Sequence, residues 1–170
     1  MDELRIPDEE ETEEIQSEVH QLKAARLRIE DVIKSGANWY FIIAVLSLIN
    51  TIIMVAGGQT RFVVGLGITS IFDAIGTELG GPGVLIALLL SILVAVLFII
   101  IGVFARKRHM WAFIVGMVLY GFDGLLLLLL KDIWSLAFHA LALYFIFKGV
   151  KALNVYEKIE RKGYIPPHTM

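Results

Sequence analysis

The sequence contains no cysteine, and its longest apolar stretches carry almost no charge. Without cysteine, neither a disulfide framework nor a thiol-based redox site is possible, which excludes one class of small four-helix oxidoreductases. Apolar residues make up 57% of the 170 residues and the mean hydropathy is +0.74. Globular chains have about 45–50% apolar residues, so this composition indicates an integral membrane protein.

Four apolar segments are each close to the ~20 residues that a helix needs to cross a bilayer. They cover residues 37–58, 83–105, 110–130 and 133–150. The second is the most apolar, with Ser91 as its one polar interruption among small and aliphatic residues. The last two meet at Lys131–Asp132, a turn short enough to make them adjacent and antiparallel. The sequence therefore predicts an all-α polytopic membrane protein with a bundle of four transmembrane helices.

The basic residues predict how this bundle is oriented. Of the 15 Lys and Arg residues, all except Arg61 and Lys131 fall on one side of a four-span topology. The positive-inside rule then places both termini and the loop Arg106, Lys107 and Arg108 in the cytoplasm, in a plasma (inner) membrane. We expect this loop to orient the protein and to contact anionic lipid. Because residues 1–14 are acidic, they do not resemble a signal peptide, and we expect the first span to act as an uncleaved anchor.

Residues 62–79 form the one segment that resembles a fifth span. Residues 61, 65, 69, 73 and 77 place polar or small side chains every fourth position, and the apolar residues recur on another face. We expect an amphipathic helix at the outer interface. The alternative is a re-entrant element that lines a cavity. The glycine-rich residues 80–83 end this segment.

Residues 1–36 are expected to form a cytoplasmic acidic tail followed by an amphipathic helix. The acidic run spans residues 8–14. The next apolar residues alternate at spacings of four and three, with Arg26 at the one polar position of this seam: Ile15, Val19, Leu22, Ile29 and Ile33. The pattern predicts about five turns of helix, broken at Ser35–Gly36. This helix either rests on the bundle and headgroups or mediates self-association or partner binding. Residues 151–170 are expected to form a cytoplasmic tail.

Within the spans, four polar residues lie at one predicted depth. Asn50, Ser91, Asp123 and His139 are each seven residues from the outer end of their span, about 10 Å along a helix. Each belongs to a stripe of small and polar residues that we expect to face inward, leaving 125–130 largely toward lipid. We expect Asp123 to pair with His139, with Tyr120, Asn50 and Ser91 in the same network. Such a layer either fixes helix register, binds a proton or ion, or lines a ligand pocket.

Several chemical functions are disfavoured by what the spans do not contain. His139 is the only histidine in a predicted span, so a bis-histidine haem is excluded, and Asp123 and His139 are too few for a metal site. We find no nucleophile elbow and no phosphate-binding loop. The basic loop is too compact for nucleic acid. We therefore expect no enzymatic activity, no cofactor and no metal. The aromatic residues Trp39, Tyr40, Trp111 and Trp134 are expected to form an interfacial belt.

Three stretches of the membrane domain carry a resemblance to a known group of proteins. Residues 112–125, 131–143 and 62–69 are similar to small prokaryotic four-span membrane proteins that are uncharacterised. The resemblance implies the four-span architecture and brings no activity, substrate or cofactor. The leading hypothesis is a structural or accessory membrane protein that self-associates or binds a partner. The alternative is a small proton- or ion-coupled transporter or channel that uses Asp123 and His139.

Overall fold

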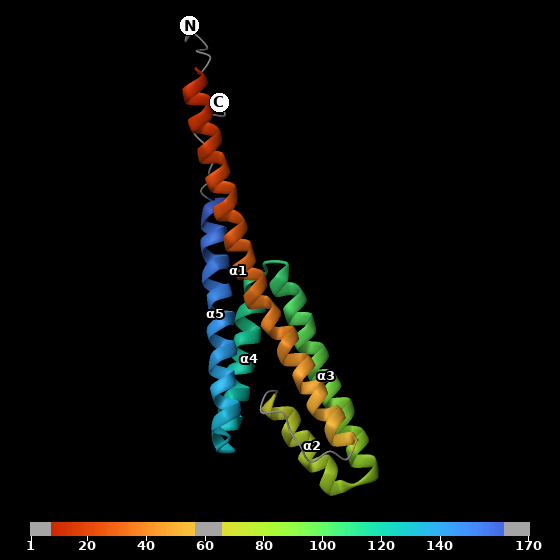
Figure 1. Cartoon of the computed structure of the whole chain (residues 1–170). Coiled ribbons are helices and arrows are strands. Elements are labelled where there is room, and N and C mark those ends of the chain that lie inside the picture. The colour runs from red at the N-terminus through yellow and green to blue at the C-terminus, as the bar shows by residue number, and fades with distance from the viewer. Residues whose placement is uncertain (1–7, 57–65, 162–170) are drawn as a thin grey trace.

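The structure, a computed structural model, describes residues 8–56 and 66–161, and these are entirely helical apart from short turns (Figure 1). The elements are α1 (Glu9–Val55), α2 (Gly67–Leu79), α3 (Gly81–Arg106), α4 (Met110–Leu129) and α5 (Ile133–Arg161). Helices α1, α3, α4 and α5 are long and apolar enough to cross a membrane. The all-helical fold and the four candidate spans are confirmed, and the protein is of the multi-pass membrane class.

Three tight turns reverse the chain between the helices. Gly80, between α2 and α3, has φ 65°, a left-handed conformation that glycine adopts without strain, and Pro82 follows in the first turn of α3. The α3–α4 and α4–α5 turns use Arg108 and Lys131, also at positive φ. We call the end of the bundle with Arg108 the basic end, and the end with Gly80 and Lys131 the α2 end.

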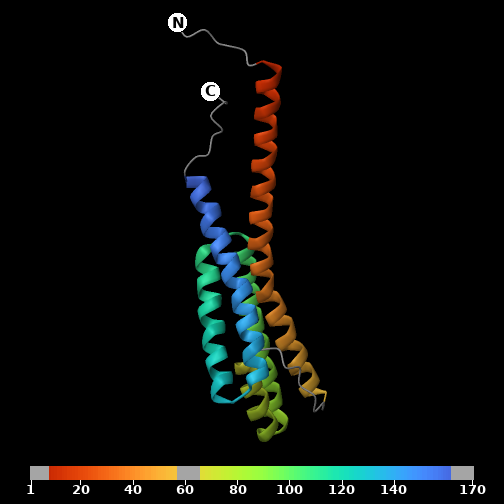
Figure 2. The same cartoon turned by 60° about the vertical axis from the view of Figure 1, so that its left-hand side comes forward.

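Helix α1 is one continuous helix, so the predicted break at Ser35–Gly36 is wrong. The glycine serves close packing instead. A Cβ atom on Gly36 would lie only 2.8 Å from the Cα atom of Gly149 on α5, and a Cβ on Gly149 would lie 3.1 Å from the Cα of Gly36. The two backbones therefore approach each other where α1 and α5 cross, and each glycine makes room for the other. Figures 1 and 2 show α1 running without interruption past the rest of the bundle.

The small and polar stripes are buried in all four long helices. Their buried members are Ala44, Ser47, Asn50 and Thr51 of α1, Ala87, Ser91 and Ala95 of α3, Gly116, Tyr120, Asp123 and Gly124 of α4, and Ser135, His139, Ala142 and Gly149 of α5. Large aliphatic side chains cover much of the outer surface. This is the reverse of a water-soluble bundle, because small residues allow close helix contact and aliphatic residues lose nothing by facing lipid.

Two predictions about individual side chains need correction. Leu127 is only 4% exposed, although Leu125 and Leu128 of the same helix are exposed. It packs at the start of α2, where its side chain lies against Gly67. Tyr40 is fully buried rather than interfacial, and its hydroxyl donates to the carbonyl oxygen of Phe113 at 2.7 Å. In both cases the position of a neighbouring helix decides burial, and a single-helix pattern does not contain that information.

Helix α2 packs along α3, joined to it by Gly80, with its polar face turned into the protein (Figure 1). Thr69 and Asp73 are 1% and 3% exposed, while the apolar Ile75 and Leu79 are 52% and 70% exposed. A helix resting on the bundle with its polar face in water has the opposite arrangement. The expected first residues of this helix, 62–65, lie outside the described residues, as do Arg61 and the end of the first expected span, residues 57–58.

We predict that Gly36→Ala lowers the stability of the bundle in detergent by about 1–3 kcal/mol, because the added methyl group overpacks the α1–α5 crossing. Gly121→Ala is the matched control: it lies in α4, and a Cβ there meets no atom within 4 Å. This control is expected to be neutral or up to about 1 kcal/mol stabilising. Thermal unfolding by circular dichroism measures both. Equal effects of the two substitutions would contradict a close α1–α5 contact.

Candidate functional site: the Asp123–His139 pair at the start of α2

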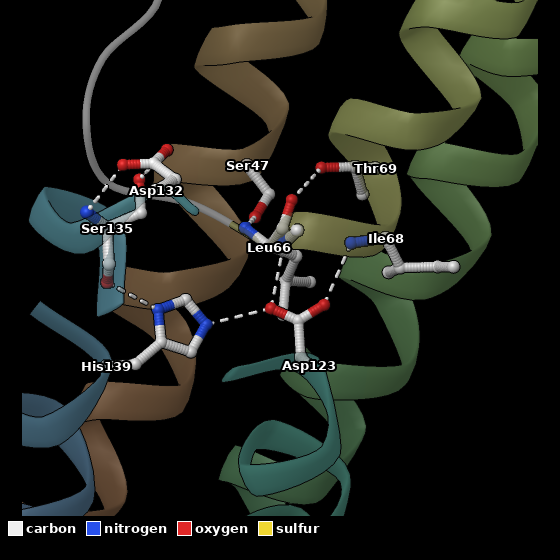
Figure 3. Close-up of polar contacts among 9 residues, drawn as sticks. Ser47, Leu66, Ile68, Thr69, Asp123, Asp132, Ser135 and His139 are labelled. Atoms are coloured by element: carbon white, nitrogen blue, oxygen red, sulfur yellow. Dashed lines mark hydrogen bonds and ion pairs between the residues drawn. The ribbon is translucent and has the colours of Figure 1, made fainter. Parts of the chain in front are cut away.

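The first turn of α2 depends on a side chain from another helix. Leu66 precedes this turn, and no side chain at that position caps it. Asp123 of α4 takes this role: its Oδ2 accepts a hydrogen bond from the Gly67 N–H at 2.7 Å, and its Oδ1 accepts one from the Ile68 N–H at 2.9 Å (Figure 3). The carboxylate thus satisfies two of the N–H groups that every helix leaves unpaired at its start, and its negative charge complements the helix dipole.

His139 of α5 contacts the same carboxylate from the other side. Its Nε2 lies 2.8 Å from Asp123 Oδ2, and its Nδ1 lies 2.9 Å from the carbonyl oxygen of Ser135 (Figure 3). A carbonyl oxygen only accepts hydrogen bonds, so Nδ1 carries a proton. A proton on the Nε2–Oδ2 contact then makes either an imidazolium–carboxylate pair or a neutral imidazole beside a carboxylic acid. Both forms have no net charge, which is what a buried pair requires.

The pair is sealed from solvent by its neighbours. His139 and Asp123 are 1% and 5% exposed. The ring of Tyr120, one turn from Asp123 on α4, stacks on the imidazole with centroids 4.1 Å apart and planes at 12°. Phe98 of α3 packs edge to face against the Tyr120 ring, with centroids 6.2 Å apart. The stacked aromatic rings therefore fix the orientation of the imidazole. Among the described residues, the imidazole makes two hydrogen bonds, one to Asp123 and one to the Ser135 carbonyl oxygen.

Three further hydrogen bonds extend this network toward α1 and toward the α2 end. Ser47 of α1 accepts a hydrogen bond from the Leu66 N–H through its Oγ at 2.7 Å. Asp132 begins α5: it accepts hydrogen bonds from the Ser135 hydroxyl at 2.6 Å and from the Ser135 N–H at 3.1 Å. These bonds hold the pKa of Asp132 below its usual range, because they stabilise the ionised carboxylate. Ser135 then presents the carbonyl oxygen that orients His139 (Figure 3).

The predicted polar layer is assembled only in part. The structure brings Asp123, His139 and the Tyr120 ring together, and it buries Asn50 and Ser91. The Ser91 hydroxyl and the Tyr120 hydroxyl, however, have no hydrogen-bond partner among the described residues. The close polar contacts of the layer are therefore concentrated around the Asp123 carboxylate, and they do not connect all five predicted residues.

Sequence reasoning missed the backbone of α2 as a partner, and it missed the roles of Ser47, Asp73 and Asp132. Asp73 was expected on the polar face of an interfacial or re-entrant helix with no partner assigned, and it is buried and accepts a hydrogen bond from the Thr51 hydroxyl at 3.4 Å. The signal that was available is local: Asp132 followed by serine three residues later is the spacing of a helix cap. The Ser47 and Asp123 contacts with α2 have no such local signal, because they join residues far apart in the chain.

A groove of about 410 Å³ opens beside the pair, between α2, α3 and α4. Asp123 is its one ionisable lining residue, and its other walls are aliphatic or aromatic, including Leu66, Ile68 and Phe98. Sites for polar solutes place several convergent polar groups around the ligand. This groove fits apolar matter, such as the acyl chains of a bilayer, better than a polar substrate.

The predicted basic loop is divided between packing and exposure. Arg108 turns back onto the bundle, where it pairs with Glu30 of α1 at 3.0 Å and donates to the Tyr156 hydroxyl of α5 at 2.5 Å. Arg26 donates to the same hydroxyl at 2.7 Å, so two guanidinium groups hold one tyrosine. Arg106 and Lys107 are exposed, and their contact with anionic lipid stays a prediction.

Within the described residues, no three His, Asp, Glu or Cys side chains gather closely enough to hold a metal ion. No match was found among protein-family models, among curated proteins or among solved structures. The resemblance to four-span prokaryotic proteins therefore stays a prediction, and function is argued from the geometry alone.

We predict that Asp123→Ala destabilises the bundle by about 3–5 kcal/mol, because it leaves His139 and two backbone N–H groups without their acceptor in an apolar interior. Asp132→Ala is the control at the exposed α4–α5 turn, where loss of a cap is expected to cost about 1 kcal/mol. Thermal unfolding in detergent measures both variants. A double-mutant cycle with His139→Ala is expected to give a coupling energy above about 1 kcal/mol; independent effects would show that the pair does not act as a unit.

Proposed function

We propose that this protein is a membrane-anchored docking protein, without enzymatic activity. It binds a partner through residues 9–25 of α1, the part of the helix that projects beyond the bundle and that we call the projecting half of α1. The observation that supports this most directly is the length of α1. Beyond Arg26, which contacts Tyr156 and Glu160 of α5, the helix continues to Glu9, about 25 Å farther (Figure 2). No other described helix accompanies it there in either view.

The apolar seam of α1 changes its surroundings along this length. At the bundle, Ile33 is fully buried and Ile29 is partly buried against the core. Beyond Arg26 the same seam continues through Leu22, which is 37% exposed, and through the half-buried Val19 and Ile15. A helix whose apolar stripe continues past the bundle can bind the apolar groove or the apolar stripe of another protein's helix. The seam thus joins the bundle to a surface suited to a partner.

Charge identifies the kind of partner. Residues 8–22 contain seven acidic side chains and no Lys or Arg. A second copy in the same membrane has the same orientation, so pairing of two α1 helices is parallel and sets the two acidic segments against each other. We therefore propose a partner that presents a basic amphipathic helix rather than a second copy of this chain. With the termini in the cytoplasm, as the positive-inside rule supports, the partner is cytoplasmic or has a cytoplasmic segment.

We also propose that α2 is re-entrant rather than interfacial. Its buried polar face, its exposed Ile75 and Leu79, and the position of its first turn at Asp123 support this placement. Asp123 lies six residues from the end of α4, about 9 Å into the bundle. At that depth a helix start needs acceptors from the protein, and the carboxylate supplies them.

We predict that the double substitution Val19→Ser with Leu22→Ser removes a bound partner without changing bundle stability, because both residues lie beyond the packed part of the seam. Leu27→Ser is the control: Leu27 is 62% exposed and lies off the seam. The measurement is the intact-complex mass of the full-length protein purified in mild detergent from its native membrane. A homodimer, or a monomer in every variant, would contradict the basic partner; retention of the partner by the seam variant would contradict docking through α1.

The Asp123–His139 pair favours a second candidate, a small transporter or channel that couples the movement of an ion or solute to protons. A buried, charge-neutral acid–histidine pair beside a re-entrant helix start is the observation that supports it. The apolar lining of the adjacent groove weighs against a polar substrate and makes this the weaker proposal.

We predict for this second candidate that flux into liposomes under an imposed pH gradient falls at least tenfold in His139→Gln. The reason is that glutamine keeps hydrogen-bonding groups and cannot carry the proton. Lys131→Gln, at the exposed turn, is the control and retains flux. Absence of flux in the unmodified protein, measured with protons and with monovalent cations, would exclude the transport function.

A further inference from the structure

We propose that Asp123, His139 and the first turn of α2 form a proton-operated latch, in which protonation of the pair releases the start of α2. The latch uses the same pair as the transport hypothesis but requires no flux, and it is independent of docking through α1. It rests on three contacts to one carboxylate: Gly67 N–H at 2.7 Å, Ile68 N–H at 2.9 Å and His139 Nε2 at 2.8 Å.

The closed state contains one proton between Nε2 and Oδ2. In that state, the charge on Asp123 is balanced by the imidazolium and by the partial positive charge of the α2 start. No other cationic side chain among the described residues contacts the Asp123 carboxylate to neutralise its charge. Among the described residues no Lys or Arg is buried. Helix α1 contributes the neutral Ser47, α3 contributes apolar groove residues, and α4 contributes the Tyr120 ring.

Three other acids lie toward the α2 end of the elements that pack around the pair, and all are farther away along their helices. Asp73 is six residues from Gly67 on α2, about 9 Å along the axis, and Asp132 is seven residues from His139 at the exposed turn. Glu78 is farther still and exposed. Asp123 is thus the acid that contacts both the imidazole and the α2 backbone.

A second proton has a different effect from the loss of the first. With two protons, Asp123 is neutral and His139 is positive, so the imidazolium faces the positive start of α2 with no negative charge between them. The Gly67 and Ile68 N–H groups lose a charged acceptor, and water is needed to replace it. With no proton on the Nε2–Oδ2 contact, the carboxylate repels the Nε2 lone pair but still accepts from both N–H groups. Acid therefore releases α2, whereas base displaces only His139.

The surroundings allow a local release. Ile68 and Leu66 line the groove of about 410 Å³, so the first turn has adjacent space to enter. The Leu66 N–H remains bonded to Ser47, which anchors the start of the turn to α1. The remainder of α2 is held along α3, where Gly76 packs against Gly83 and Ala87. The moving part is thus confined to about one turn of helix.

Hydrogen–deuterium exchange of the full-length protein in lipid nanodiscs tests the latch. After correction for intrinsic exchange, we expect peptides that cover residues 66–72 to exchange at least tenfold faster in acid, while peptides that cover 139–146 of α5 do not. Asp123→Asn is expected to exchange fast at both acid and neutral pH. Ser47→Ala, which removes a neutral acceptor from the same turn, is the matched control and keeps the pH response. A pH response that survives in Asp123→Asn, or equal acceleration in α2 and α5, overturns the latch.

A second measurement keeps the test valid if Asp123→Asn does not fold. The chain has no cysteine, so Thr69→Cys places one thiol on the buried face of α2 in an otherwise unchanged protein. Its maleimide labelling in acid, relative to that of the exposed Ile75→Cys labelled at the same pH, should be at least fivefold higher than the same ratio at neutral pH. An unchanged ratio overturns the latch. If flux depends on His139 but the start of α2 does not open in acid, the latch is contradicted and transport is not. If the start of α2 opens in acid but no flux is measured, transport is contradicted and the latch is not.

Discussion

A helix that begins inside an apolar bundle must find acceptors for its first N–H groups, and this requirement organises the α2 end of the protein. Water is not available at such a depth, and an unpaired N–H group there costs several kcal/mol. The chain solves the problem with a carboxylate from α4. That solution creates a second problem, a buried negative charge, which His139 of α5 solves in turn. One backbone requirement therefore accounts for the buried Asp123 of α4 and the buried His139 of α5.

The consequences reach every helix of the bundle. His139 is oriented by the Ser135 carbonyl, and Ser135 is fixed by the cap at Asp132, so the start of α5 is coupled to the start of α2. Ser47 adds α1 through the Leu66 N–H. Close approach makes these short contacts possible, because small residues line the facing stripes and leave the aliphatic side chains for lipid. The polar contacts of the α2 end thus depend on the close helix packing that the small residues allow.

Sequence periodicity predicted the four long helices, the buried stripes and the identity of the Asp123–His139 partners, since all three follow from helix geometry along one or two adjacent segments. It failed where a distant segment decides the outcome. Gly36 resembles a helix breaker in sequence, and only the approach of Gly149, more than a hundred residues away, gives it a packing role. The polar face of α2 resembles a water-facing side, and only the position of α1 and α4 shows that it is buried.

Helix α1 links the two ends of the molecule because it is unbroken. Its seam is half-buried or exposed beyond Arg26 and fully buried at Ile33, and the same helix presents Ser47 to the start of α2. Bending at Ser35–Gly36 would separate Gly36 from Gly149 and open the α1–α5 crossing. At the basic end, Arg26 and Arg108 hold Tyr156 between α1 and α5, which fixes the direction in which the projecting half leaves the bundle.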